Sequence, residues 1–209
     1  MKAFKYVATL IFLISGFFVV HFFSNPYKSE HPTLNETSAL TDIHLSNVKY
    51  YAKENSLDRS LLHLDQAIGM IREIQTDIDT ESYEMINEAI KGLEKVRGDI
   101  EKGELDKESL DTNFENALNQ LARAELRVSE RYAESNRPEL AKVALKYANM
   151  HLKSSFGYSS RPDFKLEQHI YVEIDSLLHT ETVASVILLE KIESIIKEID
   201  NLIAQPLSE

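Results

Sequence analysis

The chain of 209 residues contains no cysteine and no tryptophan, and it has only six glycines and five prolines. Without cysteine it forms no disulfide and no thiolate metal site, and it lacks the residue that carries the lipid of a lipoprotein anchor. Glycine and proline interrupt helices, so their scarcity indicates a chain that is mostly helical. About 165 residues follow the N-terminal region, enough to bury a core without disulfides.

Motifs for catalysis are also missing from the sequence. There is no Gly-x-Ser-x-Gly turn, no His-Glu-x-x-His helix and no glycine-rich loop that would cradle a phosphate. Acidic residues are abundant, but helix surfaces carry them for solvation alone. We therefore expect no enzymatic activity and no resident cofactor.

Basic residues are in the minority. After residue 28 the chain has 20 basic and 34 acidic residues, a net charge of −14. This balance provides no positive footprint for nucleic acid, and an anionic lipid surface should repel it. The acid excess also suits plain solvation of helix faces. We expect a protein or peptide partner and no nucleic acid.

One long hydrophobic run stands at the N-terminus. Residues 6–23 contain no charged side chain and follow Lys2 and Lys5. Eighteen residues span about 27 Å as a helix, close to the thickness of a bilayer core. We predict a single-pass membrane anchor over residues 1–23 with its N-terminus in the cytoplasm and the domain in the periplasm or outside the cell. The alternative is a cleaved signal peptide that releases the domain to the periplasm, although Phe22 and Phe23 are bulky for a cleavage site.

The rest of the chain divides into a short linker and one helical domain. Residues 24–40 are polar, contain Pro26 and Pro32, and predict a linker, with the domain over 41–204. Short connections between helices favour an antiparallel bundle or a short stack of helical hairpins, all-α, with six or seven helices. We expect Thr80 to cap the third helix, Gly103 to end it, and the last helix to be buried on more than one side. Apolar periodicity predicts helices at about 41–54, 56–78, 80–102, 106–135, 137–156, 162–179 and 181–203.

A segment of the sequence recurs after 81 residues. Tyr-Ala-Lys-Glu-Asn at 51–55 is answered by Tyr-Ala-Glu-Ser-Asn at 132–136. We expect Asn55 and Asn136 each to end one helix and to cap the next, with Asp58 and Glu139 returning the capping bond. The recurrence predicts a duplicated helical unit, and chance alignment of helical sequences is the alternative.

At these residues the chain resembles the tetratricopeptide hairpin. That family places an aromatic residue near the end of its first helix, a small residue nine positions later, a large apolar residue after thirteen and alanine after sixteen. The family's Trp and Leu-Gly positions are not matched. The resemblance implies a groove that binds a peptide or protein without chemistry of its own. The matching residues are Tyr51, Ser60, Leu64 and Ala67 in the first copy and Tyr132, Ala141, Leu145 and Ala148 in the second.

The segment 156–164 is a long aromatic loop. Tyr158, Arg161 and Phe164 are candidates for partner binding, because aromatic residues and arginine often dominate interface energy. The alternative is that these side chains fasten the loop to the core. In the predicted helix at 162–179, a spacing of four residues pairs His169 with Glu173 and Asp175 with His179.

Those pairs make His169, Glu173 and His179 candidate metal ligands, and the alternative is simple ion pairing on one helix. We expect His151, beside the apolar stripe, to be partly buried and hydrogen-bonded. The leading hypothesis is a membrane-anchored, extracytoplasmic helical module that binds protein or acts as a scaffold. The second is an envelope stress protein that binds a small ligand or a metal.

Overall fold

The computed structural model describes residues 32–75, 78–159, 165–180 and 184–205. Over these residues the chain forms seven α-helices and no strand, which confirms the predicted all-α fold. The predicted membrane anchor lies outside the described residues, as does the predicted start of the sixth helix. No described helix has the length and apolar character needed to cross a membrane. The helices are α2 (Pro32–Lys53), α3 (Leu57–Ile74), α4 (Thr80–Lys102), α5 (Lys107–Glu134), α6 (Pro138–Ser155), α7 (Lys165–His179) and α8 (Ser185–Ala204).

The first described helix begins earlier than predicted. Helix α2 starts at Pro32, although a linker was expected over residues 24–40. Proline suits a helix start, because its missing N–H would have no partner there. Two polar residues of the predicted linker, Thr37 and Ser38, are buried: the Ser38 hydroxyl donates a hydrogen bond to Glu125, and the Thr37 carbonyl accepts one from Thr41.

Aspartate side chains cap the N-terminal ends of α4 and α5. The Asp79 side chain accepts a hydrogen bond from the Ser82 amide, and Asp106 accepts one from the Ser109 amide. The prediction of Thr80 as the cap of α4 is therefore wrong by one residue. Gly103 ends α4 with a φ of 71°, as predicted, because glycine has no Cβ and adopts this left-handed conformation without strain.

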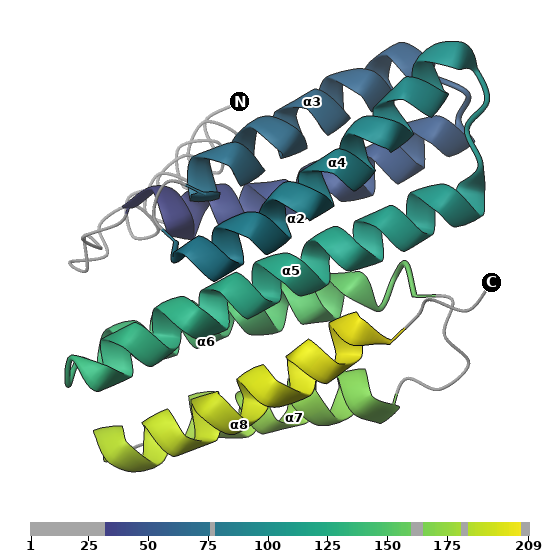
Figure 1. Ribbon diagram of the computed structural model, residues 1–209. Helices are drawn as coiled ribbons and strands as arrows, with labels where there is room; N and C mark the ends of the chain where they lie inside the picture. The colour runs from purple at the N-terminus through teal and green to yellow at the C-terminus, as the bar shows by residue number, and fades with distance from the viewer. Residues whose placement is uncertain (1–31, 76–77, 160–164, 181–183, 206–209) are drawn as a thin grey trace, which may run out of the picture. The chain divides into compact units, whose positions relative to one another are not determined.

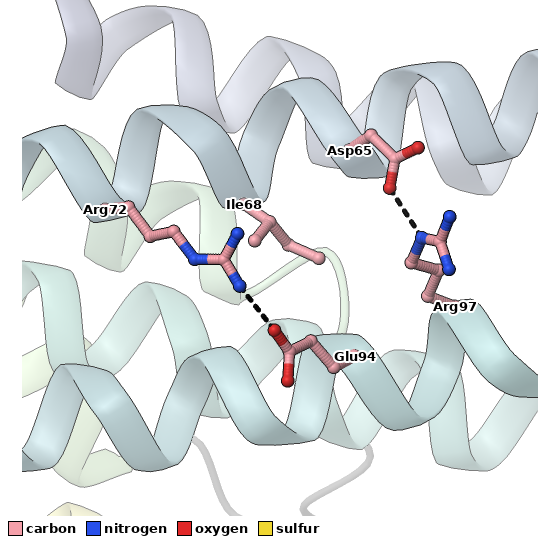
Figure 2. A pocket seen from close by; sticks show the side chains of 5 residues that line it. All are labelled: Asp65, Ile68, Arg72, Glu94 and Arg97. Carbon is pink, nitrogen blue, oxygen red and sulfur yellow. Dashed lines mark hydrogen bonds and ion pairs between the residues drawn. The ribbon is translucent and has the colours of Figure 1, made fainter.

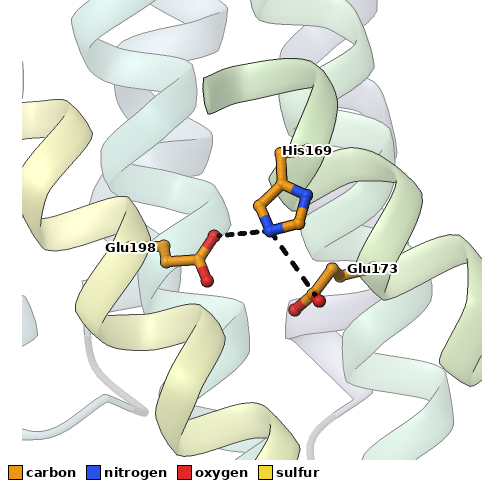
Figure 3. A group of neighbouring side chains, drawn as sticks. All are labelled: His169, Glu173 and Glu198. Carbon is orange, nitrogen blue, oxygen red and sulfur yellow. Dashed lines mark ion pairs between the residues drawn. The ribbon is translucent and has the colours of Figure 1, made fainter. Parts of the chain in front are cut away.

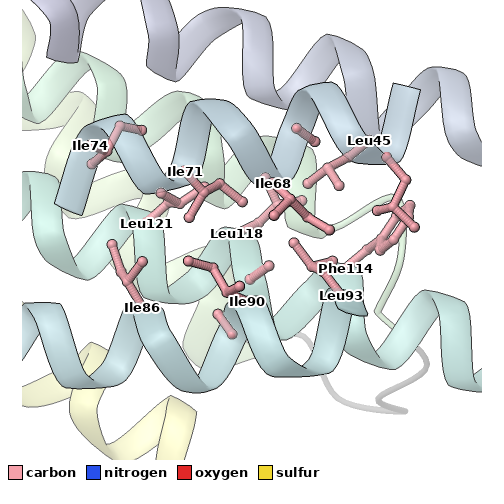
Figure 4. Packing of buried hydrophobic residues seen from close by; sticks show 14 of the residues in the cluster. Leu45, Ile68, Ile71, Ile74, Ile86, Ile90, Leu93, Phe114, Leu118 and Leu121 are labelled. Atoms are coloured by element: carbon pink, nitrogen blue, oxygen red, sulfur yellow. The ribbon is translucent and has the colours of Figure 1, made fainter. Parts of the chain in front are cut away.

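Two hydrophobic cores share α5. The first core lies among α2, α3, α4 and one face of α5, with Phe114 fully buried (Figure 4). The second joins the opposite face of α5 to α6, α7 and α8. Figure 1 shows α5 between α2–α4 and α7–α8. Residues 117–126 are consequently all buried, so α5 and not α8 is the helix covered on several sides.

Arg123 connects the two cores across α5. Its side chain is 3 % exposed, and its guanidinium pairs with Glu81 of α4 at 2.6 Å and with Asp200 of α8. Both carboxylates are much more exposed than the arginine. Burial lowers the Arg123 pKa, but the hydrogen bonds and charges of the two acids outweigh it and raise the pKa overall. The sequence did not indicate the burial of α5, because polar residues such as Arg123 interrupt its apolar stripe.

The predicted recurrence is present in the structure as two similar hairpins. The ends of α2 and α3 at residues 53, 57 and 74 recur at 134, 138 and 155 in α5 and α6, an offset of 81. Asn55 and Asn136 end the first helix of each pair with φ of 54° and 55°. The helices that follow have no side-chain capping bond, so the expected capping role of these asparagines is wrong. A left-handed asparagine ends the first helix of each pair, and the second helix starts without a side-chain cap.

Candidate functional site

A group of three potential metal ligands lies between α7 and α8. His169 and Glu173 project from α7, as the spacing predicted, and Glu198 of α8 faces them (Figure 3). The His169 Nε2 atom lies 3.8 Å from a Glu173 oxygen and 3.6 Å from a Glu198 oxygen. One imidazole and two carboxylates thus converge from two helices. Sequence spacing could not indicate Glu198, which comes from another helix.

His179, the third predicted ligand, is not part of this group. Its Nδ1 atom lies 2.8 Å from the Asp175 carbonyl oxygen and 3.4 Å from the Asp175 carboxylate, one turn earlier on α7. The side chain is exposed. The structure therefore brings together His169 and Glu173 and leaves His179 in a local pair at the end of the helix.

A surface hollow of about 260 Å³ adjoins the three ligands. Val172, Ser176 and Leu177 of α7 line it together with Lys191 of α8, and His169 and Glu173 form part of its wall. Val172 is 61 % exposed although it is apolar. The hollow leaves room for water or a small group next to the imidazole.

Tyr158, predicted as a partner-binding residue, is buried. Only 8 % of it is exposed, and its ring packs edge-on against Phe114 at 5.4 Å between centroids. The Lys49 ammonium lies 4.7 Å from the ring centroid and also pairs with Asp111 at 2.6 Å. These contacts agree with the alternative in which the loop is fastened to the core. Arg161 and Phe164 lie outside the described residues.

A buried polar network joins α2 to α5 and α6. The Asp42 carboxylate lies 2.6 Å from His151 Nδ1, and the Ser38 hydroxyl donates to Glu125 at 2.7 Å. Burial raises the pKa of Glu125 to about 7, against the opposing effects of the His151 charge and the Ser38 hydrogen bond. Burial alone would lower the pKa of His151, but the Asp42 charge and hydrogen bond and the Glu125 charge raise it overall. His151 is thus hydrogen-bonded as predicted, and it is fully rather than partly buried.

Two cross-helix ion pairs flank a groove between α3 and α4. Arg72 pairs with Glu94 at 2.5 Å, and Arg97 pairs with Asp65 at 2.7 Å (Figure 2). Ile68 lies between the pairs at the base of a hollow of about 490 Å³. The side chains in these pairs are 39–58 % exposed, so solvent screens them and each adds little to stability. Positive and negative groups balance here, which gives the groove no preference for one sign of charge.

One face of α2 exposes large apolar side chains. Leu40, Ile43 and Tyr50 are 43 %, 54 % and 58 % exposed. Spacings of three and seven residues place them on the same side of the helix. The opposite side of α2 carries the buried residues Leu45 and Val48. We call Leu40, Ile43 and Tyr50 the outer α2 face.

No protein-family model, curated protein or solved structure matches the chain. The resemblance to tetratricopeptide hairpins therefore stays a prediction, resting on the residues that carry it. Of those residues, Ser60, Leu64 and Ala67 are fully buried in the first copy, and Ala141, Leu145 and Ala148 are fully buried in the second.

Proposed function

We propose that the chain is a membrane-anchored helical module that binds a segment of another protein outside the cytoplasm. The observation that carries this proposal is the outer α2 face, where Leu40, Ile43 and Tyr50 expose apolar area on one side of a helix whose other side is fully packed. Apolar side chains scattered singly over a surface need no explanation, but three large ones on the same side of one helix favour a binding role. The proposed surface replaces the aromatic loop, because Tyr158 is buried.

The duplicated hairpins support this function. Helical hairpins built in series present extended surfaces, and proteins with such repeats commonly use these surfaces to bind other chains. The two hairpins share the last residue of the first helix, both bounds of the second helix and the left-handed asparagine between them. A rigid repeated scaffold of this kind holds α2 in place from behind, which preorganises its outer face for binding.

Charge indicates the chemistry of the partner. The chain beyond residue 28 has a net charge of −14, which attracts a basic segment and repels acidic chains, including further copies of itself. We propose a partner segment that combines apolar side chains for the outer α2 face with lysine or arginine beside them. Such an association weakens as salt screens the charges.

The N-terminal segment supplies the membrane attachment in this proposal. The uncharged run at residues 6–23 holds the chain in the bilayer, and Lys2 and Lys5 keep the N-terminus in the cytoplasm. Mass spectrometry of the mature N-terminus tests this arrangement. Recovery of a peptide that begins at Met1 or Lys2 supports the anchor, and a first residue after position 23 shows a cleaved signal instead.

Co-purification of the full chain from detergent-solubilised membranes tests the binding function. Ile43→Glu and Tyr50→Glu should each remove a partner that the unchanged chain retains, and that partner should dissociate at high salt. Val186→Glu is the matched control, because Val186 is apolar and 68 % exposed but belongs to α8. Equal retention by all three variants would reject the outer α2 face as the binding surface.

A further inference from the structure

We infer that His169, Glu173 and Glu198 form a binding site for a divalent transition-metal ion such as zinc. The ion would link α7 to α8, which supply two ligands and one ligand respectively. The site is independent of the outer α2 face and of the protein binding proposed there.

The distances in the group suit a metal better than hydrogen bonds. The imidazole Nε2 atom lies 3.8 Å and 3.6 Å from the two carboxylates, and the three ligand atoms all lie within 4.8 Å of one another. Both distances from Nε2 exceed the usual limit of about 3.2 Å for a hydrogen bond. Two ligands at about 2.1 Å from a tetrahedral ion lie about 3.4 Å apart. Shifts of a few tenths of an ångström would therefore bring each carboxylate to this distance from the imidazole, and the two carboxylates already lie within 4.8 Å of each other.

An unsatisfied carboxylate oxygen gives independent support. The Glu198 Oε2 atom is shielded from solvent and accepts no hydrogen bond, and it is the oxygen that faces His169. A buried carboxylate oxygen that accepts no hydrogen bond is unfavourable, because it loses hydration that the imidazole at 3.6 Å does not replace with a hydrogen bond. A cation between Glu198 and the imidazole would supply the missing interaction (Figure 3).

The donor set selects the class of ion. One imidazole and two carboxylates suit zinc, manganese, iron or nickel, whereas calcium and magnesium prefer sites made of oxygen alone. The two carboxylate charges balance a doubly charged ion. Three protein ligands leave a fourth position for water, and the hollow of about 260 Å³ beside His169 and Glu173 provides the space for it.

The chain contains its own control for this site. Asp175 and His179 repeat the four-residue spacing of His169 and Glu173 in inverse order on the same helix. Among the described residues, no third ligand completes that pair. If both pairs are ordinary ion pairs, neither should bind a metal ion. If the group at His169 is a metal site, only substitutions there should weaken metal binding.

Calorimetric titration of zinc into the full chain, in detergent and stripped of metal with a chelator, tests the inference. We expect one saturable site per chain, a zinc-dependent rise of several degrees in Tm, and a weaker response to magnesium. His169→Ala and Glu198→Gln should each weaken binding at least about tenfold, while His179→Ala should leave it unchanged. The Glu198 side chain is 25 % exposed and glutamine has nearly the same size, so Glu198→Gln should preserve the fold.

Two results would overturn the site. One is the absence of saturable zinc binding by the unchanged chain, and the other is equal loss of binding in the His179→Ala and Glu198→Gln variants. Ile43→Glu should bind zinc normally. Failure of this inference is therefore distinguishable from failure of the proposed protein-binding function.

Discussion

Ser60 and Ser129 make the same contact between paired helices in opposite directions. Ser60 of α3 donates a hydrogen bond to the Val48 carbonyl of α2 at 3.2 Å, and Ser129 of α5 donates to the Ala141 carbonyl of α6 at 2.8 Å. Because Val48 and Ser129 are 81 positions apart, as are Ser60 and Ala141, the two hairpins place one serine at the same crossing. The serine lies on the second helix in the first hairpin and on the first helix in the second hairpin.

The equivalence of the two crossings predicts how substitutions at Ser129 and Ala141 change stability. Ser129→Val removes one buried hydrogen bond and adds bulk where two helices approach closely, so it should lower the free energy of unfolding by about 1–3 kcal/mol. Adding Ala141→Ser reproduces the residues of the first hairpin and should restore most of that loss. Urea unfolding of the single and double variants measures both effects. Additive destabilisation in the double variant would show that the two crossings are not equivalent.

The cap of α4 is the next prediction. Asp79→Ala removes the acceptor of the Ser82 amide and should lower the free energy of unfolding by about 1 kcal/mol. Thr80→Ala is the matched control, since Thr80 is the first residue of α4 and is exposed, and it should change stability by less than about 0.5 kcal/mol. Thermal unfolding of both variants decides between the two residues. A larger effect of Thr80→Ala would contradict the observed cap.

The Tyr158 side chain should matter for stability rather than for recognition. Tyr158→Ala leaves a space beside Phe114 and should lower the free energy of unfolding by about 3 kcal/mol. Tyr158→Phe keeps the ring and should lose much less. Chemical denaturation measures the difference. If Tyr158→Ala left stability unchanged and released a co-purifying protein, the loop would be an interface.

The buried network predicts that stability falls as pH rises. In the folded chain the pKa of Glu125 is about 7, whereas its ordinary value is 4.5, so the folded state binds more protons between these values. Stability should therefore decline from about pH 4.5 to pH 7. The raised pKa of His151 acts in the same direction: its contribution is complete below the ordinary value of 6.5 and is lost as pH rises through the higher folded value.

Thermal unfolding from pH 5 to pH 8 checks this pH dependence. The unchanged chain should have the higher Tm at pH 5. Glu125→Gln keeps an acceptor for Ser38 but does not ionise, so its Tm should vary less over the same interval. Groups facing His151 and Glu125 include Asp42 and Ser38 of α2, and Asp42 also contributes to the raised pKa of Tyr158. An unchanged pH profile in Glu125→Gln would show that other groups control it.

The sequence predicted the features that depend on local pattern. Apolar spacing located the helices, Gly103 indicated a helix end, and the recurrence at Asn55 and Asn136 indicated two hairpins. Each of these depends on a few neighbouring residues, so the chain itself carries the information. The pair His169 and Glu173 could also be predicted from the sequence, because one helix turn separates the two residues.

Features that depend on tertiary contacts could not be predicted from the local sequence. The polar residues at 32–40 suggested a linker because nothing in the local sequence indicates that Ser38 meets Glu125, 87 residues later. Burial of α5 was missed for the same reason, since Arg123 is satisfied only by acids from α4 and α8. Glu198 joins His169 across two helices, and only the packing of those helices shows it.

Photo-crosslinking in intact cells tests the central claim most directly. A photoreactive residue is placed at Ile43 on the outer α2 face in one variant and at Val186 on α8 in another, both exposed in the structure. The account predicts that position 43 of the membrane-bound chain captures one defined protein through a segment rich in lysine and arginine, and that position 186 does not. No adduct at position 43, or the same adducts at both positions, would contradict it.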